Sequence, residues 1–185
     1  MSMEYSSRIS LRPFSATDVD DVMIWGSDDR VTRTTRWKTL TSKEEALSFI
    51  KEVCIPYPWR VSICIDDRSI GFLWVINPGR SGVDGNKNEG VADIGYAIAA
   101  EYWGKGIATK ALKMAIPQVF NHFPEIVKLQ AFVLLENKAS HRVLEKAGFV
   151  YQGSITHQVQ INGNEIVVVD AVYTFLSTDN IPPSP

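Results

Sequence analysis

The stretch Tyr102-Trp103-Gly104-Lys105-Gly106-Ile107-Ala108-Thr109 separates a predicted strand at 91–99 from a predicted helix at 104–120. Its two glycines let the backbone approach a ligand closely, and the first turn of the following helix offers unpaired N–H groups. Together with the helix dipole, these donors predict a binding site for a phosphate or a pyrophosphate. The same residues also fit a tight strand-to-helix connection that binds nothing.

Two widespread phosphate loops do not match this stretch. The Walker A pattern, G-x-x-x-x-G-K-[ST], is absent from the chain, and the dinucleotide pattern G-x-G-x-x-G fails because Thr109 stands at its sixth position. The dinucleotide loop also belongs to the first strand-to-helix turn of its domain, whereas this stretch lies past the midpoint of 185 residues. A nucleotide-binding domain is therefore the weaker interpretation of the glycines.

A second motif follows one strand later, from Asn137 to Phe149. Asn137 is placed as the N-cap of a helix, and Ser140 falls near the same end. Gly148 occupies the left-handed position that commonly ends a helix. The buried face of this helix is predicted to consist of Ala139, Val143, Leu144 and Ala147. Without a ligand, the motif is typical of any well-capped amphipathic helix.

Hydrophobic periodicity in the rest of the chain predicts the order β-α-α-β-β-β-α-β-α-β-β, and thus an α/β or α+β fold. Capping-box signatures at 15–18 and 41–44 begin the first two helices. Strands are expected at 8–14, 59–65, 70–76, 91–99, 127–134, 149–157 and 166–175. Pro117 lies inside the helix at 104–120, where we expect a kink or an early end.

Composition excludes several classes of protein. Hydrophobic residues make up 45% and charged residues 22% of the chain, which suits a globular domain, and a net charge of -2 argues against a nucleic-acid partner. Cys54 and Cys64 lack the spacing of a metal site or a disulfide framework, and only three histidines are scattered along the chain, so no metal is expected. With neither a signal peptide nor a membrane-spanning run visible, we expect a cytoplasmic protein that does not bind membranes.

The domain organisation is predicted to be simple. We expect one domain at 8–176, with flexible termini at 1–7 and 177–185, because the last segment is rich in Ser, Asp and Pro.

Taken together, the two motifs resemble the GNAT superfamily of acetyltransferases. The resemblance rests on Gly95–Ile98, on Trp-Gly-Lys-Gly-Ile-Ala-Thr at 103–109, on Glu136–Ser140 and on Lys146–Phe149. It covers roughly 8–176 and looks closest to the branch that includes the ribosomal-protein N-terminal acetyltransferases. It implies a mixed, mostly antiparallel sheet that is flanked by helices and splays between its fourth and fifth strands.

The resemblance also implies acetyl-CoA as co-substrate, bound in the cleft between those two strands, and no metal. Its pyrophosphate would rest on the backbone of Gly104, Lys105, Gly106, Ile107, Ala108 and Thr109. The pantetheine arm would lie along the strand that ends at Ile98 and Ala99, and Asn137 would touch it. Trp103 stands where the superfamily often has Arg or Gln, and Trp is common at this position in the branch named above.

The implied reaction is direct transfer of the acetyl group to a primary amine in a ternary complex. A lysine-type amine, with a reference pKa of about 10.4, must lose a proton before it attacks. Asp93 is the leading candidate for the base, because strand alternation places it opposite the predicted core face of Ala92, Ile94, Tyr96 and Ile98. A solvated or paired aspartate is the alternative, and Glu89 is a second candidate for the base.

The acid that protonates the departing thiolate is a tyrosine in many GNAT members, and Leu144 stands at that position here. Ser140 is predicted to approach the sulfur and to replace the tyrosine by a hydrogen bond, with helix capping as its alternative role. A non-catalytic acyl-CoA sensor or scaffold is therefore an alternative function for the whole chain.

The acceptor amine stays open among a protein N-terminus, a lysine side chain, a polyamine, an amino sugar and a small amine. The basic residues Arg30, Arg33, Arg36 and Lys38 favour an acidic acceptor, or else form a solvated loop. Trp37, Trp59 and Trp74 are expected either to line a pocket or, as is more usual for aromatic residues, to belong to the core. A monomer and a homodimer both fit the sequence.

Overall fold

The computed structural model describes residues 8–35, 37–57, 59–76, 90–161 and 164–180. The chain divides into two compact units. Unit 1 comprises Met1–Trp74 and Tyr96–Met114, and unit 2 comprises Val75–Gly95 and Ala115–Pro185. Strand β4 (Val91–Ile98) and helix α5 (Ile107–His122) each continue from one unit into the other. The single domain expected at 8–176 stays a prediction.

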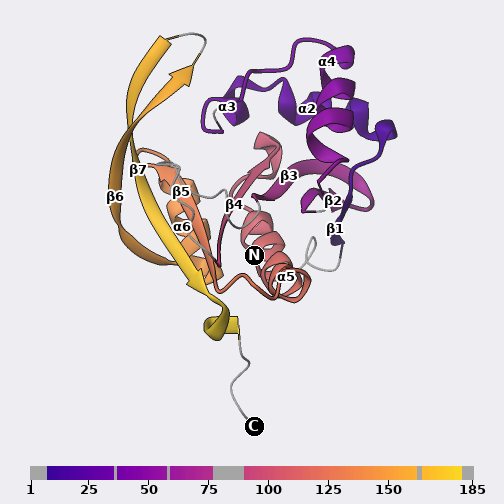
Figure 1. Cartoon of the computed structure of the whole chain (residues 1–185). Helices are drawn as coiled ribbons and strands as arrows, with labels where there is room; N and C mark the ends of the chain where they lie inside the picture. The colour runs from indigo at the N-terminus through magenta and orange to yellow at the C-terminus, as the bar shows by residue number, and fades with distance from the viewer. Residues whose placement is uncertain (1–7, 36, 58, 77–89, 162–163, 181–185) are drawn as a thin grey trace. The chain divides into compact units, whose positions relative to one another are not determined.

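Seven strands form one sheet in the order β1-β2-β3-β4-β5-β7-β6 (Figure 1). Besides β4, they are β1 (Ile9–Pro13), β2 (Arg60–Ile65), β3 (Arg68–Ile76), β5 (Lys128–Leu134), β6 (Val150–Ile161) and β7 (Asn164–Leu176). The pairs β1–β2, β2–β3, β5–β7 and β6–β7 are antiparallel, and β4 with β5 is parallel. The predicted mixed, mostly antiparallel sheet is confirmed.

The parallel ladder between β4 and β5 is short. It joins Val91–Asp93 to Lys128–Gln130, which are the first three residues of each strand. Beyond it, β4 continues to Ile98 and β5 to Leu134. A ladder confined to the start of both strands is what the predicted splay between the fourth and fifth strands requires.

In unit 1 the capping box predicted at 15–18 is present, and the cap of the second predicted helix is Ser42, one residue beyond the start of the predicted signature at 41–44. The helices of this unit are η1 (Ala16–Asp18), α2 (Val19–Gly26), α3 (Asp29–Thr32), α4 (Lys43–Ser48), the π-helix η2 (Phe49–Cys54) and η3 (Ala100–Tyr102). Asp18 accepts a hydrogen bond from the Ser15 N–H at 2.8 Å, and the Ser15 hydroxyl accepts one from Thr17 at 3.3 Å. Ser42 caps α4 by accepting from the Glu45 N–H at 3.2 Å. These bonds satisfy the orphan donors of the first turns.

Aromatic residues form much of the core of unit 1. The cluster consists of Phe14, Trp25, Trp37, Phe49, Phe72 and Trp74, with ring centroids 5.1–6.4 Å apart. Trp25 is fully buried at its centre, and Trp37 and Trp74 pack against it with part of their surface exposed. The alternative that these tryptophans belong to the core is therefore confirmed, and it holds for the buried Trp59 as well.

In unit 2, helix α6 (Lys138–Ala147) packs against one face of β5 and β7. Its Leu144 and Ala147 are buried, and the ring of Phe149 lies 5.4 Å from that of Phe175. Gly148 ends the helix with a φ of 102°, as predicted. Figure 1 shows β6 and β7 as a long, curved two-stranded ribbon. The strands expected at 149–157 and 166–175 left 158–165 as a connection between them, but pairing continues to Ile161 opposite Asn164.

Two further expectations are corrected. The early end that Pro117 suggested for α5 does not occur, because the helix runs through it to His122. A proline removes one backbone donor, and neighbouring turns can still hold the helix together. The predicted core face of β4 is buried at Ala92, Ile94 and Ile98, but Val91 and Ala97 of the opposite face are buried too, so the predicted face is not the only one that packs against the core. Strands in parallel pairs, as β4 and β5 are, are commonly covered on both sides.

The last described residues of the chain are anchored to the sheet. Ser177–Asn180 forms the short 3₁₀ helix η4, and the Ser177 N–H donates to Val127 at 2.9 Å. Segments 1–7 and 181–185 of the predicted flexible termini lie outside the described residues.

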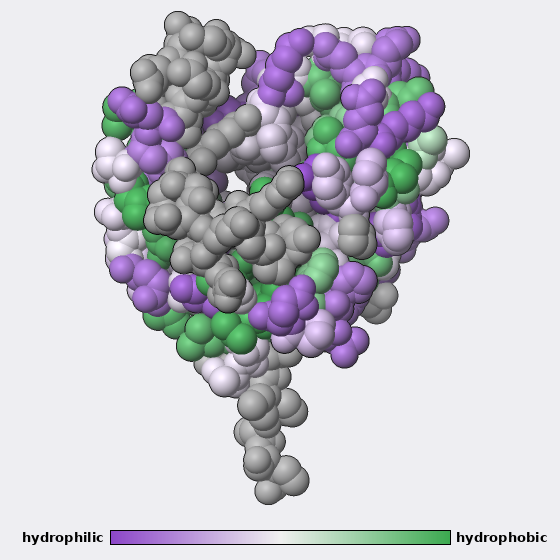
Figure 2. Space-filling view, in the orientation of Figure 1, coloured by the Kyte–Doolittle hydropathy of each residue, from purple (hydrophilic) through white to green (hydrophobic). Residues whose placement is uncertain are grey.

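The surface over α2 to α4 is mainly hydrophilic, with smaller apolar areas between (Figure 2). None of the helices in the described ranges has the length and hydropathy needed to cross a membrane.

A pair of glycine substitutions tests how closely β3 and β4 approach each other. A Cβ on Gly71 would lie 2.3 Å from the Ala97 carbonyl oxygen, whereas a Cβ on Gly26 would meet the end of the flexible Leu40 side chain at 2.7 Å. We expect Gly71→Ala to cost about 1–3 kcal/mol of unfolding free energy, because backbone must move. Gly26→Ala should cost clearly less. Thermal unfolding of both variants measures this, and equal losses would contradict the close approach.

Candidate active site

The loop before α5 has the geometry of an anion site. Gly104 and Gly106 have φ values of 73° and 77°, a left-handed conformation that favours glycine. The Lys110 N–H donates to the Gly106 carbonyl at 3.1 Å, so the N–H groups of the first helical turn precede any intrahelical bond. A Cβ on Gly104 would meet no atom within 4 Å, which leaves open space beside the loop. These features fit a pyrophosphate.

The end of β4 next to this loop is held by two hydrogen bonds. The Trp103 indole N–H donates to the Ile98 carbonyl at 2.8 Å, and the Ala99 N–H donates to Ile70 of β3 at 2.8 Å. Backbone groups of a strand alternate between its two edges, so the Ile98 N–H points to the edge away from β3. That edge is where the resemblance places the pantetheine arm. Trp103 thus fixes the strand end, and 47% of its surface stays exposed.

The start of α6 is capped as predicted, with a division of roles. The Asn137 side-chain oxygen accepts from the Ser140 N–H at 3.2 Å. Ser140 contributes its backbone to this bond, and its hydroxyl is left for another partner. Capping is therefore the role of Asn137, and the predicted approach of Ser140 to a sulfur is compatible with the cap.

Leu144, at the position where the resemblance would place a tyrosine acid, is apolar and 1% exposed. The nearby Tyr173 is no simple replacement. Its hydroxyl lies 2.9 Å from His141 Nδ1 and donates to Glu145 at 3.2 Å. Burial and the Glu145 charge raise the pKa of Tyr173. The sequence analysis missed this network, although His141 and Glu145 stand four residues apart on one helix face.

Asp93 is partly exposed and is hydrogen-bonded to a neighbouring strand. Its Oδ1 accepts a hydrogen bond from Gln130 Nε2 at 2.8 Å, and Gln130 itself is 8% exposed. Burial raises the pKa of Asp93, and the bond from Gln130 partly opposes this shift. Gln130 was missed because only the β4–β5 register, which pairs it with Asp93, reveals the contact. The second candidate, Glu89, lies outside the described residues.

The predicted site residues fall into two groups. Those of unit 1 come together around the start of α5, and they are Ile98, Ala99, Trp103, Gly104, Lys105, Gly106, Ile107, Ala108 and Thr109. Unit 2 holds Asp93, Asn137 and Ser140. Within unit 2, Asp93 of β4 pairs with Gln130 near the start of β5, and Asn137 follows the end of β5. At a rise of about 3.3 Å per residue, the length of β5 from Gln130 to Leu134 keeps them on the order of 13 Å apart.

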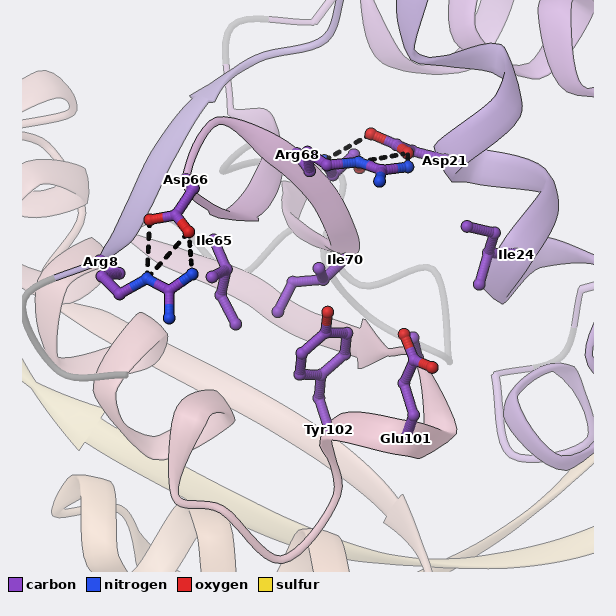
Figure 3. Close-up of a pocket in the computed structure, with 11 residues that line it drawn as sticks. Arg8, Asp21, Ile24, Ile65, Asp66, Arg68, Ile70, Glu101 and Tyr102 are labelled. Carbon is purple, nitrogen blue, oxygen red and sulfur yellow. Dashed lines mark hydrogen bonds and ion pairs between the residues drawn. The ribbon is translucent and has the colours of Figure 1, made fainter. Parts of the chain in front are cut away.

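A separate surface pocket of about 210 Å³ lies entirely within unit 1. Figure 3 shows two ion pairs on its walls, Arg8 with Asp66 and Arg68 with Asp21, around an apolar floor that includes Ile65 and Ile70. Because each arginine already faces an aspartate, the pocket has no excess of positive charge among these residues. It is therefore a poor candidate for a phosphate site.

The basic stretch after α2 is partly neutralised. Arg30 pairs with Asp28 at 2.6 Å, and Lys38 pairs with Glu45 at 3.1 Å. Arg36 lies outside the described residues. With two of its four cations paired, the stretch gives little support to an acidic acceptor. Within the ranges that the structure describes, no group of His, Cys, Asp and Glu side chains is arranged to hold a metal ion.

Comparison with known proteins gives these features a context. Residues 8–150 match the family model described as an acetyltransferase (GNAT) domain. A probable N-acetyltransferase of Bacillus subtilis, YjcK, is 32% identical over 137 residues, which cover 74% of this chain and 70% of the relative. The spermidine N(1)-acetyltransferase of Escherichia coli is 36% identical over 72 residues, 39% of this chain and 38% of the relative. A putative ribosomal N-acetyltransferase of B. subtilis, YdaF, is 35% identical over 72 residues, 39% of each chain.

Solved structures share the fold at low sequence identity. A GNAT-family acetyltransferase from Bacillus anthracis aligns with a TM-score of 0.75 at 18% identity, covering 91% of this chain and 95% of that one. The spermidine N-acetyltransferase of Vibrio cholerae, in complex with CoA and spermine, aligns with a TM-score of 0.72 at 20% identity, covering 94% and 98%.

A charge placed in the loop tests the anion site. We expect Gly106→Glu to abolish the binding of acetyl-CoA measured by titration calorimetry, because it adds bulk and negative charge where the pyrophosphate is predicted. Asn121→Glu adds the same charge near the other end of α5, at an exposed position, and should bind like the wild type. Equal affinity of wild type and Gly106→Glu would show that the loop is only a turn.

Proposed function

Because this chain belongs to the acetyltransferase (GNAT) family, we propose that it acetylates a small-molecule amine with Asp93 as the general base. The protein is an N-acetyltransferase that uses acetyl-CoA. The observation that carries the assignment of the base is the half-buried Asp93 carboxylate, held by Gln130 at 2.8 Å. The base, the residues that hold the cofactor and the acceptor class are the parts proposed here.

The environment of Asp93 suits proton abstraction. A carboxylate with an ordinary pKa near 3.9 is a weak base at neutral pH, and burial moves the pKa of Asp93 toward the working range. Gln130 occupies Oδ1, which leaves Oδ2 to take a proton from the ammonium form of the acceptor. The bond from Gln130 also fixes the orientation of the carboxylate, so that less motion has to be restricted when the acceptor binds.

The cofactor fits the described backbone. Donors from the loop and first turn at 104–109 would hold the pyrophosphate, and the free edge of β4 at Ile98 would pair with an amide of the pantetheine arm. Acetyl-CoA supplies the activated thioester carbon, where a bond to the amine nitrogen forms and the bond to sulfur breaks. Ser140, whose hydroxyl takes no part in the described cap, would donate a hydrogen bond to that sulfur.

The acceptor class rests on weaker support than the reaction. The name of one relative specifies spermidine, and a structural neighbour was solved with spermine, so both act on or bind aliphatic amines. A protein N-terminus, as the ribosomal branch would use, is the second candidate and is favoured by the partial match to YdaF. A cytoplasmic location agrees with two free, buried cysteines and stays a prediction, as does the choice between monomer and homodimer.

Removal of the proposed base should slow the reaction without weakening the cofactor site. We expect Asp93→Asn, which keeps the shape of the side chain, to lower kcat by roughly 10²–10⁴-fold and to leave the Kd for acetyl-CoA unchanged. Steady-state kinetics with a reactive primary amine and calorimetry measure the two quantities. Asp20→Asn, at the exposed start of α2, serves as the control. A kcat close to that of wild type would remove Asp93 from the mechanism.

The partner of the base should appear in the pH profile. Gln130 lowers the pKa of Asp93, so Gln130→Leu should raise it and shift the acidic limb of log(kcat/KM) to higher pH. The sign follows because a base with a higher pKa stays protonated, and hence inactive, up to a higher pH. An acidic limb that stays in place or moves to lower pH would argue against Asp93 as the titrating base.

The non-catalytic alternative has its own signature. A sensor or scaffold would bind acetyl-CoA with normal affinity and turn over no amine, in wild type and in Asp93→Asn alike. Single-turnover assays with a panel of primary amines distinguish this outcome from simple choice of the wrong acceptor.

A further inference from the structure

One carbonyl group holds the junction between β5 and helix α6. The carbonyl of Leu134, the last residue of β5, accepts a hydrogen bond from the Asn137 N–H at 2.9 Å. The same oxygen lies 3.3 Å from Nε2 of His141, in the first turn of α6. A carbonyl oxygen has two lone pairs, so it can accept both bonds at once. The end of the strand is therefore joined to the turn through the backbone and to the helix through the His141 side chain.

This carbonyl determines which ring nitrogen of His141 carries a hydrogen. Because a carbonyl oxygen only accepts hydrogen bonds, Nε2 must be the donor. The other nitrogen, Nδ1, lies 2.9 Å from the hydroxyl of Tyr173 on β7. The partner of one ring nitrogen sets the protonation of the other, and a hydroxyl can donate to Nδ1. Tyr173 thus supports the form of the ring that binds Leu134.

Tyr173 supports this bond in either charge state of the ring. Its hydroxyl stands between His141 Nδ1 and the carboxylate of Glu145, which is 3.2 Å away. When the imidazole is neutral, the hydroxyl can donate to Nδ1. When the imidazole is protonated, Nδ1 donates to the hydroxyl oxygen, and the hydroxyl donates to Glu145. In both cases Nε2 keeps its hydrogen, and with it the bond to Leu134.

Helix α6 does not need His141 in order to begin or to end. Asn137 caps its start, and Gly148 ends it with a left-handed φ. The His141 side chain adds a different constraint, because it connects the first turn of the helix to the end of β5 and to the buried Tyr173 of β7. It therefore fixes where the first turn lies relative to two strands.

Ser140 is the residue whose position depends on this constraint. Its N–H donates to the Asn137 side-chain oxygen at 3.2 Å, and the next residue in the chain is His141. Both neighbours of the Ser140 side chain along the first turn are therefore fastened to the end of β5. The proposed function assigns to the Ser140 hydroxyl a hydrogen bond to the thioester sulfur. Such a bond weakens steeply when its direction changes, so it requires a fixed backbone.

We propose that His141 is a positioning residue for acetyl transfer: through its bond to Leu134 it holds the first turn of α6 so that the Ser140 hydroxyl faces the departing sulfur. This inference rests on the proposed function and adds a residue to it. The reaction itself is unchanged. A bond forms between the amine nitrogen and the thioester carbon, and the carbon–sulfur bond breaks with its electron pair passing to sulfur. His141 acts through Ser140 and neither gives nor takes a proton in this step.

Two substitutions at one position separate the two ends of the imidazole. The amide nitrogen of glutamine reaches to where Nε2 lies, whereas that of asparagine reaches only to Nδ1. We expect His141→Asn to lower kcat about three- to tenfold, the effect of one lost hydrogen bond, and to leave the Kd for acetyl-CoA close to that of wild type. His141→Gln should restore most of kcat. Steady-state kinetics with a reactive primary amine and calorimetry measure the two quantities.

The control for these variants is Arg142→Asn, at an exposed position one residue further along α6, which should leave kcat unchanged. A His141→Gln enzyme as slow as His141→Asn, or a His141→Asn enzyme as fast as wild type, would overturn the proposal.

Combined substitutions test whether His141 acts through Ser140. We expect Ser140→Ala to lower kcat about three- to tenfold, and His141→Asn to add no further loss in that background, because no hydroxyl is left to position. A histidine that merely stabilises α6 would lower kcat by the same factor in both backgrounds, and that result would refute the positioning role.

The wild type offers a measurement that needs no variant. The chain contains three histidines, His122, His141 and His157, and NMR of protein labelled in its histidine rings shows which nitrogen of each carries a hydrogen. We expect Nε2 of His141 to carry one at every pH at which the protein is folded. A ring with hydrogen on Nδ1 alone would overturn the proposal, even where the His141 variants fail to fold.

The inference and the proposed function fail in different ways. If Ser140→Ala has the kcat of wild type, the role of Ser140 in the proposed function is wrong, and the inference falls with it. If Ser140→Ala is slow and His141→Asn is not, the role of Ser140 stands and the positioning role of His141 is wrong.

Discussion

The three-residue ladder between β4 and β5 is the constraint on which the candidate site depends. It holds Asp93 against Gln130, and neither side chain would have a defined partner without that register. Past the ladder, β4 keeps an edge that faces away from β3, and its last residues lead through Trp103 into the glycine loop. One strand therefore carries the proposed base near its start and the predicted cofactor contacts at its end, and helix α5 begins directly afterwards.

Caps, turns and glycines were readable from the sequence because each depends on near neighbours. Ser15, Ser42 and Asn137 cap helices through residues two or three positions ahead, and Gly148 needs only its own φ. The glycine loop, and the leucine at 144 where a tyrosine acid is usual, could likewise be recognised from a short stretch of sequence. Contacts across strands were not readable, because Gln130 meets Asp93 from 37 positions away. The contact of His141 on α6 with Tyr173 on β7 likewise appears only when the helix is placed on the sheet.

The wrong expectations share a physical origin. Pro117 and the segment at 158–165 were interpreted from local preference, and in both places the surrounding structure overrides it: α5 continues through the proline, and the hairpin ladder continues to Ile161. The face of β4 was assigned from alternation alone, which cannot reveal that Val91 and Ala97 on the opposite face are buried as well. The same limitation applies to charge. Arg30 and Lys38 look like a cationic surface in the sequence, and their pairing with Asp28 and Glu45 depends on how the backbone turns.

The relative cost of the two proton transfers explains how the chain can function with Leu144 in place of a tyrosine. A primary amine with a pKa of about 10.4 is neutral in only about one molecule in 10³ near neutral pH, a penalty of roughly 4 kcal/mol. A thiol has a reference pKa of about 8.5, so its anion is a far better leaving group than an alkoxide and needs little assistance. The larger barrier lies on the side of the amine, where the half-buried Asp93 stands. A hydrogen bond from Ser140 is then sufficient on the side of the sulfur, and selection would act first on the face that receives the amine.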